Sequence, residues 1–255
     1  MARVVVISGG GTGIGFGVAE AFAADGEQLV LVGRRAEVLD RAAARLRTAF
    51  PGIPAPLAVA ADLADPAGAE HAAKAVGERW DRVDVLVNSA GGNAALGAPA
   101  DRTGGLAGTA WHWEQNFRAN TLTAVLLTEA LKDRLATPGG RVVLVSSIAA
   151  YRGSGSGSYG GSKAALHPYA YDLSAELGPR GVTVNVVAPG YVADTEFFRG
   201  ALSAERERTL VAQTDTGRAG LPEDVAATVR WLASPEAGQI TAQVVQVNGG
   251  AERGR

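Results

Sequence analysis

A glycine-rich turn near the N-terminus constrains the fold more than any other stretch of this sequence. Residues 4–7 form a β-branched run, residues 8–15 contain five glycines, and residues 16–24 form an alanine-rich helical segment. A strand, a glycine turn and a helix in this order are the context of a dinucleotide-binding turn, because glycines let the backbone approach a pyrophosphate and the helix N-terminus offers N–H donors. Glycine spacing alone is weak evidence in a chain with 34 glycines. With its flanking segments, the turn predicts nucleotide binding through Gly9, Gly11, Thr12, Gly13, Ile14 and Gly15.

Short apolar runs alternate with helical segments along the whole chain. The sequence predicts strands at residues 4–7, 29–32, 57–61, 83–87, 141–145, 182–187 and 244–247. It predicts helices at residues 16–24, 38–48, 66–80, 111–135, 159–177, 194–213 and 222–232. No linker, repeat or break in composition interrupts this order. We therefore predict an α/β fold: one domain over residues 1–255, with a doubly wound parallel sheet of about seven strands and helices on both faces.

The end of the second predicted strand indicates which dinucleotide is bound. An acidic residue that holds the ribose 2′-hydroxyl of NAD is expected about 20 residues beyond the glycine turn. Gly33, Arg34 and Arg35 stand there instead. Guanidinium groups suit a phosphate monoester, so we predict NADP(H) rather than NAD(H), with Arg34 on the phosphate and Arg35 stacked on the adenine. The alternative is that both arginines are merely solvated at the start of a helix, where the positive end of the dipole disfavours them.

Composition excludes several classes of protein. The net charge of −2 gives no electrostatic reason to expect nucleic acid or an anionic membrane as a partner. The chain has no cysteine and only three scattered histidines, which excludes thiolate chemistry and argues against a metal site. The apolar run at residues 4–7 is far too short for a signal peptide or a membrane span, so we expect a cytoplasmic protein.

Tyr159 and Lys163 are the strongest candidates for catalysis. Four residues apart on a predicted helix, they share one face, and an ammonium group near a phenol lowers its pKa. Most Tyr/Lys pairs at this spacing are only a buried tyrosine beside a surface lysine. This chain, however, has 3 lysines against 21 arginines, so a lysine here indicates that a compact ammonium donor is needed. We predict that the pair moves a proton.

Two long segments lack apolar periodicity and are expected to border a substrate pocket. Residues 92–108 are rich in glycine and alanine and are predicted to be a loop. Residues 191–215 are predicted to form a substrate lid, since their helical part is heavily charged and carries Phe197 and Phe198 near its start. Both phenylalanines are equally compatible with a place in the core or at its rim.

The chain resembles the short-chain dehydrogenase/reductase family, in its common form of about 250 residues that includes 3-oxoacyl reductases. The resemblance covers nearly the whole sequence. Its markers occur in order and at the family spacing, and together they are far more specific than any one of them. They are Gly9, Gly13 and Gly15; Asp62-Leu63; Asn88-Ser89-Ala90-Gly91; Asn120; Ser147; Tyr159 with Lys163; Pro189-Gly190; and the segments 217–225 and 247–250.

The resemblance implies a role for each catalytic marker. Tyr159 would be the general acid/base, and Lys163 would lower its pKa and hold the ribose of the nicotinamide. Ser147 would hydrogen-bond the substrate oxygen. Asn120 would bend its helix and position a water molecule in a proton relay. Cofactor contacts are also implied, with Asp62 and Leu63 at the adenine, Asn88, Ala90 and Gly91 along the cofactor, and Pro189, Gly190, Val192 and Thr195 bordering the nicotinamide.

Two positions depart from the family pattern. Ser147 precedes Tyr159 by one residue less than is usual, whereas Ser146 has the usual count. Alignment from the preceding strand favours Ser147, with one residue deleted from the glycine/serine loop that follows. The threonine expected to contact the carboxamide comes one place late, as Thr195 behind Asp194.

The sequence thus predicts an NADP(H)-dependent oxidoreductase that transfers a hydride between nicotinamide and a carbonyl or secondary alcohol, most simply as a ketone reductase. The alternatives are an NAD-dependent alcohol dehydrogenase of the same family and a non-catalytic NADP-binding sensor or scaffold. A homotetramer or homodimer is implied by the resemblance alone. The expected partner is a small-molecule carbonyl or alcohol substrate.

Overall fold

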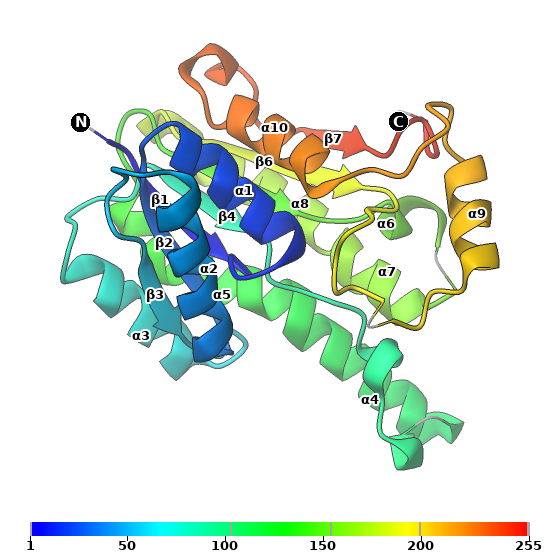
Figure 1. The fold of residues 1–255 in the computed structure, drawn as a ribbon. Coiled ribbons are helices and arrows are strands. Elements are labelled where there is room, and N and C mark those ends of the chain that lie inside the picture. The colour runs from blue at the N-terminus through cyan, green and yellow to red at the C-terminus, as the bar shows by residue number, and fades with distance from the viewer. Residues whose placement is uncertain (1, 103, 154, 199, 254–255) are drawn as a thin grey trace.

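A seven-stranded parallel sheet forms the centre of the computed structural model, which describes residues 2–102, 104–153, 155–198 and 200–253. The sheet order is β3-β2-β1-β4-β5-β6-β7, and every pair of neighbours is parallel (Figure 1). The predicted fold class is confirmed. The strands are β1 (Val4–Ser8), β2 (Gln28–Gly33), β3 (Leu57–Ala60), β4 (Val85–Asn88), β5 (Arg141–Val145), β6 (Thr183–Pro189) and β7 (Val244–Val247).

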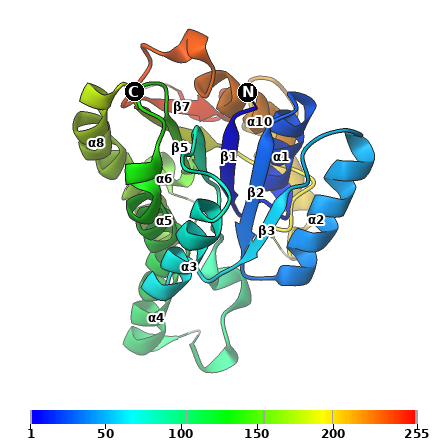
Figure 2. The ribbon, with the colours of Figure 1, turned by 90° about the vertical axis from the view of Figure 1, so that its left-hand side faces the viewer.

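Helices cover both faces of the sheet and create two separate apolar layers (Figure 2). Valine-rich strands suit this arrangement, since a parallel sheet buries both of its faces. In β1, Val4 and Val6 face one layer while Val5 and Ile7 face the other. The first layer is completed by α3 (Pro66–Gly77), α5 (Thr123–Leu131) and α8 (Leu166–Leu177), and the second by α1 (Gly13–Ala24), α2 (Ala36–Ala49) and α10 (Pro222–Leu232).

The strand order reverses between β1 and β4. From β1 the chain builds outward to β2 and β3, and from β4 it builds outward on the other side to β7. This reversal opens a crevice at the carboxyl ends of the strands, which is where ligands bind in open α/β sheets. The Ser8 hydroxyl at the end of β1 accepts hydrogen bonds from the backbone N–H groups of Ser89 (3.1 Å) and Ala90 (3.0 Å). It thereby fixes the loop after β4 against the glycine turn.

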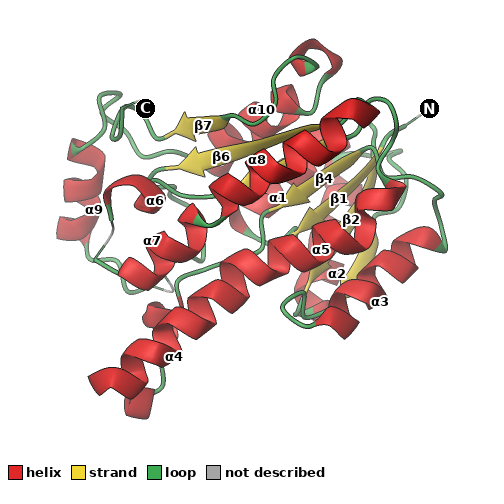
Figure 3. Ribbon diagram, turned by 180° about the vertical axis from the view of Figure 1, so that it is seen from behind, coloured by secondary structure: helices red, strands yellow, loops and turns green. Residues whose placement is uncertain are grey.

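The predicted helix over residues 111–135 starts earlier and is not uniform. It begins as α4 (Gly105–Phe117), passes through a π-helical turn at Arg118–Leu122 and continues as α5. The predicted loop over residues 92–108 therefore ends sooner and contains 3₁₀ turns at Ala94–Gly97 and Ala100–Arg102, with Thr103 outside the described residues. Apolar periodicity missed the first turns because they project from the body of the protein, where even Leu106 is exposed (Figure 3).

The helix predicted over residues 194–213 is largely wrong. Only α9 (Ala204–Ala212) is helical, and the preceding residues are irregular, with Arg199 outside the described residues. Asp194 adopts a left-handed conformation (φ 56°), which a helix does not tolerate. Ser203 then starts α9, because its hydroxyl accepts a hydrogen bond from the backbone of Arg206 (3.1 Å). Helix propensity alone did not reveal this cap.

The predicted helix over residues 159–177 is divided into α7 (Gly157–Ala164) and α8. Pro168 accounts for the division, because it has no N–H group to donate to the carbonyl of Ala164. The predicted loop before α7 contains a short helix, α6 (Ala149–Arg152), and Ser154 lies outside the described residues. Among the described residues, no helix combines the length and apolar character needed to cross a membrane.

Candidate active site

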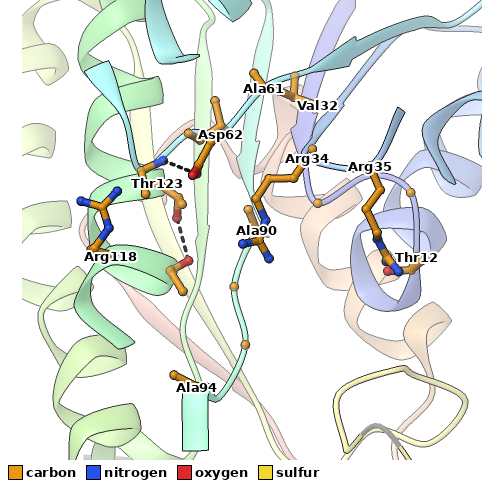
Figure 4. Close-up of a pocket in the computed structure, with 18 of the residues that line it drawn as sticks. Thr12, Val32, Arg34, Arg35, Ala61, Asp62, Ala90, Ala94, Arg118 and Thr123 are labelled. Carbon is orange, nitrogen blue, oxygen red and sulfur yellow. Dashed lines mark hydrogen bonds between the residues drawn. The ribbon is translucent and has the colours of Figure 1, made fainter. Parts of the chain in front are cut away.

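A cavity of about 380 Å³ lies at the carboxyl edge of the sheet, beside the strand-order reversal. Its walls come from the glycine turn, the ends of β2 and β3, the loop after β4 and one side of α4 and α5 (Figure 4). Nine of the predicted cofactor-binding residues line it. They are Gly9, Gly11, Thr12, Arg34, Arg35, Asp62, Leu63, Ala90 and Gly91.

The glycine turn fits an extended anionic group because side chains are excluded from it. Gly9 has a positive φ (69°), and a Cβ atom there would lie only 3.0 Å from the backbone of Ala90. A Cβ atom at Gly15 would collide with the carbonyl oxygen of Gly9. Thr12 occupies the N-cap of α1, but its side chain caps none of the helix N–H groups. The N-terminus of α1 thus keeps its donors for a phosphate-bearing ligand.

Two exposed arginines extend from the end of β2 into the cavity (Figure 4). Arg34 has neither a hydrogen bond nor an ion pair with any residue that the structure describes. Arg35 forms an ion pair with Glu196, at 2.9 Å between Nη2 and Oε2. Across the cavity, Arg118 and Thr123 belong to its lining and were not predicted from the sequence. Their place on the π-helical turn and α5 depends on the tertiary fold.

The carboxylate of Asp62 is held at the cavity wall by its own turn. Its Oδ1 atom accepts a hydrogen bond from the backbone N–H of Ala64 (3.1 Å). Leu63 is buried beside it, as part of the layer against β2 and β3. These positions leave the Asp62 side chain next to the arginines that follow β2, within one continuous cavity.

Tyr159, Lys163 and Ser147 lie buried together behind this cavity. Tyr159 and Lys163 are one turn apart on α7, as the spacing predicts. The Ser147 hydroxyl, just beyond β5, lies close enough to Tyr159 to lower its pKa, and it accepts a hydrogen bond from the backbone N–H of Ala149 (3.2 Å). The Lys163 ammonium donates to the carbonyl of Val145 at 2.7 Å. A phenol, a serine hydroxyl and a buried amine therefore meet at the end of β5.

Burial dominates the protonation of this group. It raises the pKa of Tyr159 to about 12, and the neighbouring Ser147 hydroxyl opposes that rise. It also lowers the pKa of Lys163 to about 8. The sequence predicts that Lys163 lowers the pKa of Tyr159, but the pKa of Tyr159 is raised, because desolvation disfavours the charged forms of both residues. Tyr159 is consequently protonated at neutral pH.

The two candidate serines face different partners. Ser147 contacts Tyr159, as described above. The Ser146 hydroxyl instead donates to the backbone carbonyl of Lys163 (3.0 Å) and lies 2.8 Å from Nε2 of His167. Ser146 therefore stabilises the backbone of α7 at Lys163. The geometry supports the assignment made from the strand alignment, in which Ser147 is the serine that meets a substrate.

Asn120 occupies the π-helical turn and is buried. Its side-chain amide pairs with Gly92 in both directions, donating to the carbonyl and accepting from the N–H at 2.9 Å each. It also donates to the Ser162 hydroxyl (3.1 Å). A Cβ atom at Gly91 would lie 2.5 Å from the Asn120 oxygen and 3.0 Å from the Lys163 nitrogen. Asn120 and Lys163 thus approach each other across a position that only glycine can fill.

Sequence reasoning missed a second buried asparagine one turn earlier. Asn116 accepts a hydrogen bond from the backbone N–H of Ala94 (3.1 Å) and donates to the Ser158 hydroxyl (3.0 Å). The Asn120 side chain in turn donates to the Asn116 carbonyl (3.0 Å). Two asparagines four residues apart in a helix were a detectable signal, since they share one helix face. Together they attach the loop after β4 to the helix that carries Tyr159.

The remaining predicted cofactor residues lie outside the cavity lining. Asn88 donates to the Thr128 hydroxyl (2.9 Å). Gly190, after β6, is packed so closely that a Cβ atom would lie 2.9 Å from Asn248. Thr195 lies over the glycine turn, 3.3 Å from the place of a Cβ atom on Gly13. The residues that do not line the cavity are Gly13, Ile14, Gly15, Asn88, Tyr159, Lys163, Pro189, Gly190, Val192 and Thr195.

Comparison with known proteins agrees with this geometry. A family model described as enoyl-(acyl carrier protein) reductase matches residues 9–252. Galactitol 2-dehydrogenase (L-tagatose-forming) from Cereibacter sphaeroides is 35% identical, over 96% of this chain and 92% of its own. The 3-oxoacyl-[acyl-carrier-protein] reductase FabG of Vibrio cholerae is 29% identical, over 97% and 96%. The RhlG/NADP active-site complex from Pseudomonas aeruginosa is 30% identical, with a TM-score of 0.82 over 98% and 97% of the two chains.

The chain belongs to the short-chain dehydrogenase/reductase family. It is therefore an oxidoreductase that acts on carbonyl or alcohol substrates. Members of the family use nicotinamide dinucleotides, and the glycine turn and the cavity described above suit such a group.

Proposed function

We propose that the protein is an NADP(H)-dependent ketone reductase, which uses Tyr159 as its proton donor. The observation that carries this proposal is the buried contact of Ser147 with Tyr159 one helical turn from Lys163, behind a cavity lined by two arginines. Bound NADPH supplies the hydride. The protein must then orient the carbonyl and deliver a proton to its oxygen.

The Ser147 and Tyr159 hydroxyls lie close together, and each would turn its single proton toward one carbonyl oxygen when a substrate binds. Such donors stabilise negative charge as it develops on that oxygen in a buried site. The pKa of Tyr159, raised to about 12, keeps the proton in place until the oxygen becomes basic enough to take it. Lys163 would hold the ribose hydroxyls of the nicotinamide, and Asn120 would support it across Gly91.

The choice of NADP(H) over NAD(H) rests on Arg34 and Arg35. Arginines rather than a carboxylate directly follow β2, and Arg34 has no ion-pair partner among the described residues, so its charge is available for a 2′-phosphate. Asp62 and Leu63 would contact the adenine from the neighbouring wall. The NADP complex of the similar protein from Pseudomonas aeruginosa supports the same choice.

Two further features belong to this proposal. We infer that residues 191–215 form the substrate lid, because Phe197 packs on Tyr159 with 5.5 Å between the ring centroids.

We also infer a homotetramer or homodimer. Trp113, Leu122 and Tyr171 leave apolar surface exposed along α4, the π-helical turn and α8, which favours self-association. Light scattering of the purified protein measures this directly, and a monomer at micromolar concentration would contradict it.

The test is steady-state oxidation of NADPH with a panel of ketones, 3-oxoacyl thioesters, ketoses and quinones, and with an enoyl thioester as the competing acceptor. The proposal predicts turnover with at least one carbonyl compound and slower turnover with the enoyl thioester. Turnover only with NADH would assign the NAD-dependent alternative. Tight NADPH binding without turnover on any acceptor would favour a sensor or scaffold.

A further inference from the structure

The cavity covers only one half of the predicted dinucleotide site. It extends from Arg34 and Arg35 along the glycine turn to Gly91, but its lining includes neither Tyr159 nor Ser147. The space toward Tyr159 is bordered instead by residues 194–198, which we call the strap. The strap starts at Asp194, whose left-handed conformation turns the chain sharply after Val192.

Three successive strap residues contact three different parts of the site. Thr195 lies against Gly13 in the glycine turn. Glu196 pairs with Arg35 at 2.9 Å. Phe197 packs on the ring of Tyr159, with the centroids 5.5 Å apart. The strap thus spans the site from the arginine predicted to contact the adenosine end to the tyrosine predicted to donate the proton.

A dinucleotide that reaches from Arg34 to Tyr159 would meet this strap at Gly13 and beside Tyr159. The nicotinamide end needs the space beside Tyr159, which Phe197 shares, and the pyrophosphate needs the glycine turn, which Thr195 covers. The adenosine end needs no such movement, because the cavity already lies open to it. The two ends of the site therefore differ in what binding requires of the protein.

We propose that a 2′-phosphate held chiefly by Arg34 also draws the adjacent Arg35 away from Glu196, and that this opens the nicotinamide end. This inference rests on the proposed use of NADPH. Glu196 acts as a counter-ion that a phosphate replaces, since a phosphate monoester offers the guanidinium more acceptor oxygens and more charge than a carboxylate does. Once the phosphate has replaced Glu196 as the partner of Arg35, the strap loses the ion pair that holds Thr195 and Phe197 across the site.

The expected coupling is modest because both partners of the ion pair are exposed. Exposed pairs contribute at most about 1 kcal/mol, and this corresponds to a change in affinity of about two- to fivefold. By linkage, a ligand that destabilises the closed strap must raise the affinity of any ligand that binds only when the strap is open, and by the same factor. The coupling is therefore measurable with two fragments that do not touch each other.

The experiment measures binding of reduced nicotinamide mononucleotide by calorimetry, in the presence of saturating adenosine 2′-phosphate or saturating adenosine. In the unaltered protein, adenosine 2′-phosphate should tighten nicotinamide mononucleotide binding about two- to fivefold more than adenosine does. In Glu196→Gln the mononucleotide should bind more tightly from the start, and the two adenosine fragments should have equal effects. The Phe197→Ala variant should also bind the mononucleotide more tightly, because no phenyl ring then has to move away from Tyr159.

Glu205→Gln is the matched control. Glu205 lies in the first turn of α9, just after the strap, and forms no ion pair with the residues that the structure describes, so this variant should keep the coupling. Equal effects of the two adenosine fragments on the unaltered protein, or coupling that survives in Glu196→Gln, would overturn the inference. If NADPH itself does not bind, the proposed function fails instead, so the two failures are distinguishable.

Discussion

The adenosine and nicotinamide ends of the site are built in different ways. At the adenosine end, a backbone turn and two exposed arginines face an open cavity. At the nicotinamide end, Tyr159, Lys163, Ser147 and Asn120 are buried. The Lys163 and Asn120 side chains there donate hydrogen bonds to the Val145 carbonyl and the Ser162 hydroxyl. The first end can select a ligand by charge with little change in structure. The second end controls the proton, and its properties come from burial.

Among the comparisons of a variant with its matched neighbour, the largest effect is expected for the two adjacent serines at the nicotinamide end. Ser147→Ala should lower kcat about 10²- to 10³-fold, since it removes a donor aimed at the developing charge. Ser146→Ala should lower kcat less than about tenfold, because the Ser146 hydroxyl contacts the Lys163 carbonyl and His167 rather than Tyr159. Steady-state kinetics of both variants checks this. The reverse order of effects would mean that Ser146 is the catalytic serine.

The second prediction tests burial of Lys163 through the pH dependence of stability. Its pKa of about 8 in the folded protein lies below the ordinary value of 10.5, so the unfolded chain binds more protons between these values. The unfolding free energy should therefore rise with pH across this window, by on the order of 3 kcal/mol from this group. Lys163→Met should lack that contribution. Urea unfolding of both proteins from pH 7.5 to 10.5 measures the difference, and parallel curves would contradict the prediction.

The third prediction tests the adenosine end. Arg34→Ala should weaken NADPH binding by about 1.5–3 kcal/mol, roughly 10- to 100-fold, and leave NADH binding nearly unchanged. Arg41→Ala is the control, because Arg41 is exposed on α2 and does not line the cavity. Both cofactors can be titrated by fluorescence. Equal losses for NADPH and NADH would refute the assignment of Arg34 to the 2′-phosphate.

The smallest effect is expected between the two ends, at Asn116. Asn116→Ala removes the hydrogen bonds to Ala94 and Ser158 and should cost about 1–2 kcal/mol of unfolding free energy. Asn93→Ala should cost less, because its hydrogen bond to the backbone of Ala95 is exposed. Thermal or urea unfolding compares them. If Asn93→Ala is the more destabilising variant, the loop after β4 is not held by the buried asparagines.

The contrast between the two ends also explains what could be predicted from the sequence. The sheet, the glycine turn and the positions of Arg34 and Arg35 follow from local patterns, because backbone conformation and exposed charge are local properties. The pairing of Ser147 with Tyr159 needed the strand alignment, and the structure brings these two residues together. Arg118, Asn116 and the contact of Glu196 with Arg35 depend on segments distant in the chain.

The failures have the same physical origin. A charged, helix-prone sequence suggested a helix from residue 194, whereas Asp194 turns and the strap crosses the site. A tyrosine beside a lysine suggested a lowered tyrosine pKa, whereas burial of the whole group raises it. In both cases tertiary packing outweighed a sound local preference, and in both cases this happened at the nicotinamide end.

The most direct measurement is single-turnover reduction of a carbonyl substrate by Tyr159→Phe, together with its affinity for NADPH. This change removes only the hydroxyl and keeps the ring that packs on Phe197. We predict that the rate falls at least about 10²- to 10⁴-fold, since the proton donor is lost, while the Kd for NADPH stays within about threefold. A rate within about tenfold of the unaltered protein would contradict the assignment of Tyr159 as the proton donor.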